Sequence, residues 1–141
     1  MFSFIFVTHA DLGASLVRTA EFIMQEDFKE RCEVFSIDYS MLADMNRIKE
    51  MLEQAVDRFA GKGHKVVIFV DIFGGSPSNV AFTFVKREGV DVITGVSLPM
   101  VIYAFEHREH DMTIAQMAAG IIQAGEDNLI GAKKLLEKEG R

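Results

Sequence analysis

Four short segments with the character of β-strands alternate with segments of helical periodicity, and this alternation limits the chain to a few folds. The strand-like segments cover residues 2–7, 33–38, 66–70 and 90–96. The third is continuously apolar and rich in β-branched residues, as expected of a strand that is covered on both faces. Strands that alternate with helices are typical of crossover units around a parallel sheet. The pattern therefore predicts an α/β fold.

Apolar residues recur at helical spacing after each of the first three predicted strands. They predict one helix after Gly13 and a second helix from about Met45 that ends at Gly61. Ser76 is placed to cap a third helix, which would run to about Lys86.

Two further helices are predicted in the last third of the chain. Pro99 opens the first of them. Thr113, followed three residues later by Gln116, forms a capping box that starts a long terminal helix. Three glycines weaken this helix, namely Gly120, Gly125 and Gly131. A kink or a break in the helix is therefore expected.

Length and composition indicate one globular domain over residues 1–141. Of these residues 49% are hydrophobic and 26% charged, which suits a closed core and a soluble surface. The net charge of -6 argues against nucleic acid or an anionic membrane as a partner, since both would require a concentrated basic face. No apolar stretch reaches the roughly 18 residues of a membrane span, and the first residues lack the basic region of a signal peptide. A cytoplasmic protein is expected.

Metals, nucleotides and other cofactors are not expected. Cys32 is the only cysteine, so neither an intrachain disulfide nor a thiolate metal cluster is predicted. His64, His107 and His110 are interpreted as surface or packing residues, because no third metal ligand accompanies the last two. The chain has neither a P-loop nor a Gly-x-Gly-x-x-Gly fingerprint, which argues against a bound nucleotide.

His9 and Asp71 are the candidate catalytic residues, because each stands where a predicted strand gives way to a loop. Ligands bind at the carboxyl ends of parallel strands. If the first and third strands are neighbours, as in open doubly wound sheets, the two side chains emerge side by side. A carboxylate that accepts a hydrogen bond from one ring nitrogen fixes the histidine tautomer and raises the basicity of the other nitrogen. Asp71 would then orient a nucleophilic His9.

The start of the third predicted helix offers a place for an anion beside the histidine. Gly74 and Gly75 let the backbone approach closely, and Ser76 adds a hydroxyl. No lysine or arginine lies within residues 7–14 or 70–79, so the predicted cradle for a phosphoryl group consists of neutral dipoles. Judged by spacing alone, a histidine after a strand is more often structural. A small-molecule site of flavodoxin type is a further alternative.

Four segments, taken in order, resemble the IIA component of mannose-family sugar phosphotransferase systems. They are Val7-Thr8-His9, Arg18-Thr19-Ala20-Glu21, residues 70–79 with the sequence Val-Asp-Ile-Phe-Gly-Gly-Ser-Pro-Ser-Asn, and Gly95-Val96-Ser97-Leu98-Pro99-Met100. The likeness covers nearly the whole chain, and Asp-x-x-Gly-Gly-Ser-Pro-x-Asn is its most specific element. We interpret residues 1–141 as a single domain of this mannose type.

The resemblance implies a phosphotransferase that works through a phosphohistidine. In the family, a histidine in the place of His9 accepts a phosphoryl group from the phosphocarrier protein HPr and passes it to a IIB component, expected here as a separate protein. Asp71 is implied as its orienting partner. The implied phosphate-binding residues are Thr8, Gly74, Gly75 and Ser76. An alternative is a regulatory relay module of an incomplete system, which signals to a partner protein through its phosphorylation state.

The resemblance also implies how such domains assemble. Family members are homodimers of three-layer α/β sandwiches with a mainly parallel sheet in strand order 2-1-3-4. Known examples have an additional antiparallel edge strand, for which this sequence offers no evident segment. Contact with the membrane would be indirect, through the IIC and IID components of the sugar transporter.

One departure from the family pattern lies next to the histidine. The family usually has glycine there, whereas this chain has Ala10-Asp11, which predicts a less permissive loop and an extra negative charge near the phosphate. Four apolar side chains are candidates for a docking rim around the site, with ordinary loop packing as the alternative; they are Leu12, Phe73, Pro99 and Met100.

Overall fold

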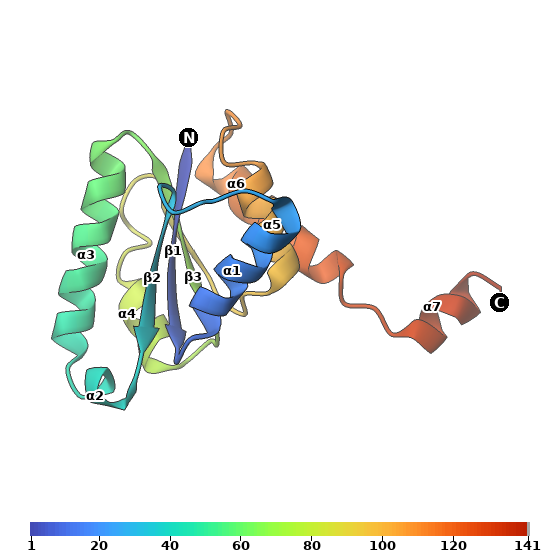
Figure 1. The fold of residues 1–141 in the computed structure, drawn as a ribbon, viewed down its shortest axis with the longest axis horizontal. Coiled ribbons are helices and arrows are strands. Elements are labelled where there is room, and N and C mark those ends of the chain that lie inside the picture. Colours follow the sequence, from blue (N-terminus) through green and yellow to red (C-terminus); the bar gives the residue numbers. More distant parts are fainter. Residues whose placement is uncertain (141) are drawn as a thin grey trace.

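The computed structural model describes residues 1–140 and shows helices packed around one parallel sheet (Figure 1). The strands are β1 (Phe2–His9), β2 (Cys32–Ile37), β3 (Lys65–Val70) and β4 (Val90–Ile93). Their order in the sheet is β2-β1-β3-β4, which confirms the predicted order. Among residues 1–140 the sheet consists of these four strands, so the additional antiparallel strand is absent from that part of the chain.

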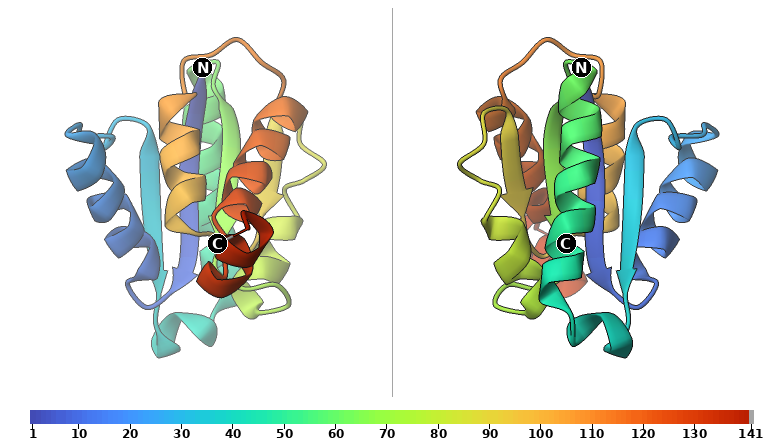
Figure 2. Two further views of the ribbon diagram at one scale, coloured as in Figure 1. Left: turned by 90° about the vertical axis from the view of Figure 1, so that its right-hand side faces the viewer. Right: turned by 90° about the vertical axis from the view of Figure 1, so that its left-hand side faces the viewer.

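Helices cover both faces of the sheet and make three layers (Figure 2). One face carries α1 (Leu12–Met24), α5 (Leu98–Glu106) and α6 (Ile114–Asp127). The other face carries α3 (Met45–Gly61) and α4 (Ser76–Phe82). The short helix α2 (Tyr39–Leu42) follows the carboxyl end of β2.

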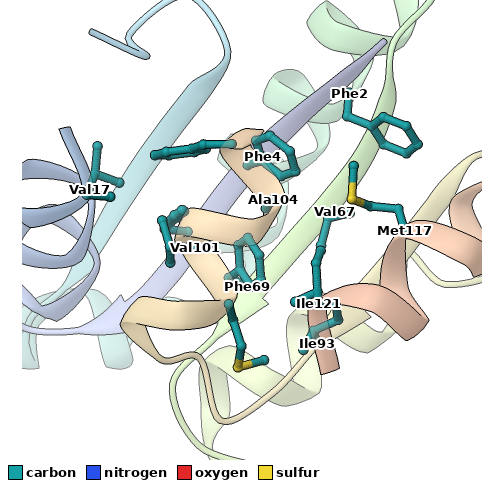
Figure 3. Packing of buried hydrophobic residues seen from close by; sticks show 14 of the residues in the cluster. Phe2, Phe4, Val17, Val67, Phe69, Ile93, Val101, Ala104, Met117 and Ile121 are labelled. Carbon is teal, nitrogen blue, oxygen red and sulfur yellow. The ribbon is translucent and has the colours of Figure 1, made fainter. Parts of the chain in front are cut away.

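Alternate residues of the central strand β1 face the two helical layers, as the pleat of a strand requires. Phe4 and Phe6 belong to the core on the side of α1, α5 and α6, and Ile5 and Val7 belong to the core on the other side. Figure 3 shows part of this first core, with Phe4 and Phe69 in it. The ring centroids of Phe4 and Phe105 lie 5.6 Å apart. Burial on both faces holds β1 in one register, because a slip by one residue would exchange its two faces.

The parallel register aligns the carboxyl ends of the strands at one edge. Val7 pairs with Val70, and His9 pairs with Ile37. The residues that follow β1, β2 and β3 therefore meet at this edge of the sheet, where ligands bind in parallel α/β proteins.

The structure corrects the start and the end of the third predicted helix. The N-cap of α4 is Gly75, so Ser76 is the first helical residue rather than the cap. The helix ends at Phe82 and not near Lys86, and its C-cap Thr83 donates its hydroxyl hydrogen to the Val80 carbonyl at 2.7 Å. Such a side-chain bond competes with continuation of the helix.

Two other boundaries differ from the sequence pattern. Helix α2 was not predicted; Asp38 caps it by accepting a hydrogen bond from the Met41 backbone at 3.0 Å. Strand β4 ends at Ile93 rather than at residue 96, because Gly95 has a φ of +72° and turns the chain.

The predicted break in the terminal helix is confirmed, and it lies at Gly131, the last of the three predicted glycines, which is the N-cap of α7. The capping box of Thr113 and Gln116 starts α6 as predicted. Gly120 lies inside α6 because Tyr103 packs against it; a Cβ there would meet the Tyr103 hydroxyl. The chain leaves the helix after Asp127 and forms α7 (Ala132–Lys138), which lies apart from the sandwich (Figure 1).

Candidate functional site

His9 and Asp71 are in contact, as the strand order predicted. The Asp71 Oδ2 lies 3.0 Å from His9 Nδ1 and also accepts a hydrogen bond from the His9 backbone N–H at 2.8 Å. A carboxylate only accepts hydrogen bonds, so the neutral ring carries its proton on Nδ1 and the lone pair on Nε2. The His9 side chain is 42% exposed and that of Asp71 only 11%. The pair thus combines an accessible imidazole with a shielded carboxylate.

The Asp71 carboxylate is fixed through both of its oxygens. Its Oδ1 accepts a hydrogen bond from the Ile72 backbone at 3.0 Å, while Oδ2 holds His9. A carboxylate tied at both ends has little freedom to rotate. It therefore fixes the orientation of the imidazole.

Thr8 shapes the loop between β1 and α1 from inside the protein. Its side chain is fully buried, and its Oγ1 accepts a hydrogen bond from the Gly13 backbone at 2.8 Å. A Cβ at Gly13 would lie 3.0 Å from that oxygen, so glycine permits the close approach. The Thr8 hydroxyl is therefore engaged inside the protein, and the contact of Thr8 with phosphate stays a prediction.

The loop between β3 and α4 lies against the imidazole ring. Gly74 has a φ of +88°, a conformation that favours glycine. Gly75 lies so close to the histidine that an added Cβ would be 3.4 Å from the His9 Cε1. Ser76 is exposed at the first position of α4, where backbone N–H groups have no partner within the helix. Of the three predicted cradle residues in this loop, Gly75 is the one that the structure places against the His9 ring.

Near the start of α4 the structure places a cation that the local sequence pattern missed, in a depression that His9 does not line. Lys49 of α3 lines a depression of about 280 Å³ together with Ser76 and Asn79 of α4. The segments around His9 and Asp71 contain no basic residue, so no cation was predicted near the site. Lys49 lies one turn after Met45, at the predicted start of a helix. This position was the only sequence signal for a cation near that end of the helix.

The remaining histidines lie away from this edge of the sheet. His64 Nδ1 lies 2.7 Å from the Ser3 hydroxyl near the amino ends of β1 and β3, and burial lowers the pKa of its imidazole. His107 Nδ1 donates to the Tyr103 carbonyl at 2.8 Å. No cluster of three metal-binding side chains occurs within residues 1–140.

Comparison with known proteins assigns the family. The family model described as PTS system fructose IIA component matches residues 3–122. The chain belongs to this family. Membership supports a phosphocarrier role in a sugar phosphotransferase system.

Two curated proteins and one solved structure illustrate the relationship. The fructose-specific EIIA component of Bacillus subtilis is 29% identical, with 78% of this chain and 73% of that protein aligned. The mannose-specific EIIAB component of Escherichia coli K12 is 28% identical over 93% of this chain, which spans only 40% of that longer protein. The EIIA structure from Streptococcus agalactiae superposes with a TM-score of 0.82 at 18% identity, covering 95% of this chain and 99% of that chain, and so supports the fold.

The apolar rim of this IIA-family chain is narrower than predicted. Leu12 and Phe73 are exposed, the latter to 73%, and Phe73 packs against the ring of Phe82 at 5.9 Å. Met100 is instead buried in the core, against Gly125. No helix among residues 1–140 is long and apolar enough to cross a membrane.

Ala10 stores backbone strain next to the histidine. Its φ is +49°, in the left-handed region that disfavours a residue with a Cβ. Its N–H nevertheless donates to the Ile37 carbonyl at 2.9 Å, and this bond ties the loop to β2.

Replacing Ala10 by glycine should therefore raise the free energy of unfolding by about 0.5–1 kcal/mol, because the relieved strain exceeds the entropic cost of glycine. Ala119→Gly is the matched control, since Ala119 is exposed within α6. This variant should lower the free energy of unfolding by about 0.5–1 kcal/mol, because glycine disfavours the helix. Urea denaturation followed by circular dichroism measures both. Equal losses in the two variants would contradict strain at Ala10.

Proposed function

We propose that His9 accepts a phosphoryl group from HPr and passes it to a IIB component of a sugar phosphotransferase system. The observation that carries this proposal is the hydrogen bond between His9 Nδ1 and Asp71, which leaves Nε2 as the nucleophilic nitrogen of an accessible ring. Contact with the membrane is assigned to the IIC and IID components.

Transfer to His9 exchanges one nitrogen–phosphorus bond for another. The Nε2 lone pair attacks the phosphorus of phosphorylated HPr, and the donor histidine leaves with the electron pair of the broken bond. The His9 ring gains positive charge while Nδ1 keeps its proton. Asp71, bonded to Nδ1, stabilises this charge and lowers the barrier. In the passage to IIB, His9 is the leaving group: the acceptor on IIB attacks the phosphorus, and the electron pair of the broken bond returns to Nε2.

The phosphoryl group on Nε2 would be held by the β3–α4 loop. Backbone N–H groups of Gly74, Gly75 and Ser76, together with the Ser76 hydroxyl, are the proposed donors. The absence of a Cβ at Gly75 lets the loop lie against the ring. Thr8 holds the opposite loop from below through its bond to Gly13. Neutral donors suit a carrier, because they hold the phosphoryl group without neutralising it.

The chain should be labelled at His9 when phosphoenolpyruvate, enzyme I and HPr are supplied. The label should be acid-labile and alkali-stable, and His9→Ala should carry none. His64→Gln and His107→Gln are matched controls, because both rings lie away from the site, and they should be labelled as the wild type is. An unlabelled wild type in the presence of active donors would refute the proposal.

Asp71→Asn should slow phosphorylation of His9 by at least about tenfold, because an amide no longer fixes the Nδ1–H tautomer. Rapid-quench kinetics measure the rate, and ¹⁵N NMR of the imidazole reports the tautomer directly. Asp57→Asn is the control, since Asp57 pairs with Arg87 on the surface. Unchanged kinetics and an unchanged tautomer in Asp71→Asn would remove Asp71 from the mechanism.

We further propose that the chain forms a homodimer through its C-terminal segment. Helix α7 has seven residues and no buried side chain, and it lies apart from the sandwich (Figure 1). Its Leu135 and Leu136 are exposed, as are Leu129 and Ile130 before it. A helix this short is unstable in water without packing. A second copy of the chain would supply that packing.

Leu135→Glu combined with Leu136→Glu should convert the dimer to a monomer in sedimentation velocity, because charges would have to be buried at the contact. The control Lys133→Glu with Lys134→Glu changes the charge of the same helix without removing apolar side chains. A wild type that sediments as a monomer at micromolar concentration would refute the dimer.

A further inference from the structure

A second depression lies beside His9, on the side of β2 and away from the loop between β3 and α4. Its volume is about 260 Å³, and it lies between the end of β1 and the segment that leads into α2. Its lining residues are His9, Ala10, Ile37, Asp38, Tyr39 and Leu42. Apart from His9 itself, the proposed transfer chemistry uses none of these residues.

The walls of this depression are largely apolar. Ile37 is buried at the end of β2, and Leu42 packs against the core beneath α3. Tyr39 is 93% exposed, so its ring stands in solvent at the rim. An exposed aromatic ring beside a pocket is typical of a contact that becomes buried when a partner protein binds.

One carboxylate supplies the charge of the depression. Asp38 Oδ1 accepts hydrogen bonds from the Ser40 hydroxyl at 2.7 Å and from the Met41 backbone at 3.0 Å. These bonds lower the pKa of the Asp38 carboxyl, so the group is ionised at neutral pH. Asp38 forms no ion pair within residues 1–140, and no lysine or arginine lines the depression.

We propose that this depression receives a lysine or arginine side chain of the protein that exchanges the phosphoryl group with His9. The aliphatic stem would lie against Tyr39 and Leu42, and the cationic head would meet Asp38. This inference rests on the proposed phosphocarrier function and makes Asp38 and Tyr39 residues that determine partner specificity.

Charge complementarity favours this occupant over the others. Lysine and arginine combine an apolar stem with a charged end, as the lining does. An acidic side chain would repel the ionised Asp38, and a purely apolar one would leave its charge without a counterion. Asp11 adds a second carboxylate next to the loop, and its side chain makes no capping bond at the start of α1.

The same arrangement would assist transfer in both directions. A phosphoryl group on His9 brings about two negative charges close to Asp38 and Asp11. A cation carried by the partner would offset that repulsion only while the two proteins are in contact. After the partner leaves, the carboxylates would again repel the phosphoryl group and so keep it ready for the next transfer.

The test is the second-order rate of phosphoryl transfer from phosphorylated HPr to the wild type and four variants. Asp38→Asn keeps a side-chain oxygen for the cap of α2 but removes the charge, and Tyr39→Ala removes the exposed ring. Asp27→Asn and Phe22→Ala are matched controls at α1 and the loop after it; Asp27 Oδ1 accepts the Lys29 backbone N–H at 2.8 Å, and Phe22 is exposed.

Asp38→Asn should slow transfer about two- to fivefold at low ionic strength, and about 0.5 M salt should abolish the difference because it screens the pair. Tyr39→Ala should slow transfer at both salt concentrations. Both controls should match the wild type. Wild-type rates in Asp38→Asn, or an equal slowing in Asp27→Asn, would overturn the proposal. A slowing in Tyr39→Ala alone would overturn the cationic occupant.

A second measurement separates failure of this inference from failure of the phosphocarrier function. Titration with n-butylguanidinium, followed by NMR, should shift the signals of Ala10, Ile37 and Leu42 in the wild type, with smaller shifts in Asp38→Asn. This readout needs no phosphoryl donor, so it tests the depression even if His9 is never labelled. No shift at these residues would overturn the assignment of the depression to a cationic side chain.

Discussion

The parallel pairing of β1 with β3 is the constraint on which the site depends. Val7 pairs with Val70, so His9, two residues further along β1, and Asp71, directly after β3, lie at the same edge of the sheet and come within hydrogen-bond distance. The register is held from both faces by buried side chains, because β1 lies between two helical layers. The packing of both cores thus fixes the strand register, and this register brings His9 to the carboxylate that sets its tautomer.

Electrostatics at the site are dominated by carboxylates and backbone dipoles. Asp71 bonds to the imidazole directly, whereas Asp38 lines the depression beside it, and no lysine or arginine among residues 1–140 lines that depression. Lys49 lines the separate depression beside Ser76. Within the described part of the chain, the carboxylates around His9 are not matched by cations. This arrangement supports the proposed carrier role, since a phosphoryl group that is not neutralised is more readily passed on. Partner proteins would supply positive charge only while they are in contact.

Part of this site was predictable from sequence and part was not. The contact of His9 with Asp71 follows from two strand ends and the usual strand order, which the pattern of apolar runs indicates. The cap of α4 was predicted at Ser76, but the chain turns through Gly74 and makes Gly75 the cap. Thr8 was assigned to phosphate, whereas its hydroxyl bonds to Gly13 inside the protein. Residue type alone does not reveal which way a short side chain points.

The sequence by itself determined the alternation of strands and helices, the identity of the nucleophile candidate and the family, because periodicity and motifs are local properties of the chain. Only the tertiary structure decided that Lys49 shares a depression with Ser76, that Tyr39 and Leu42 line a depression with His9, and that Ala10 adopts a left-handed φ. These relations join segments that are distant in sequence or depend on loop conformation. They arise from strand register and helix packing, which no single stretch of sequence encodes.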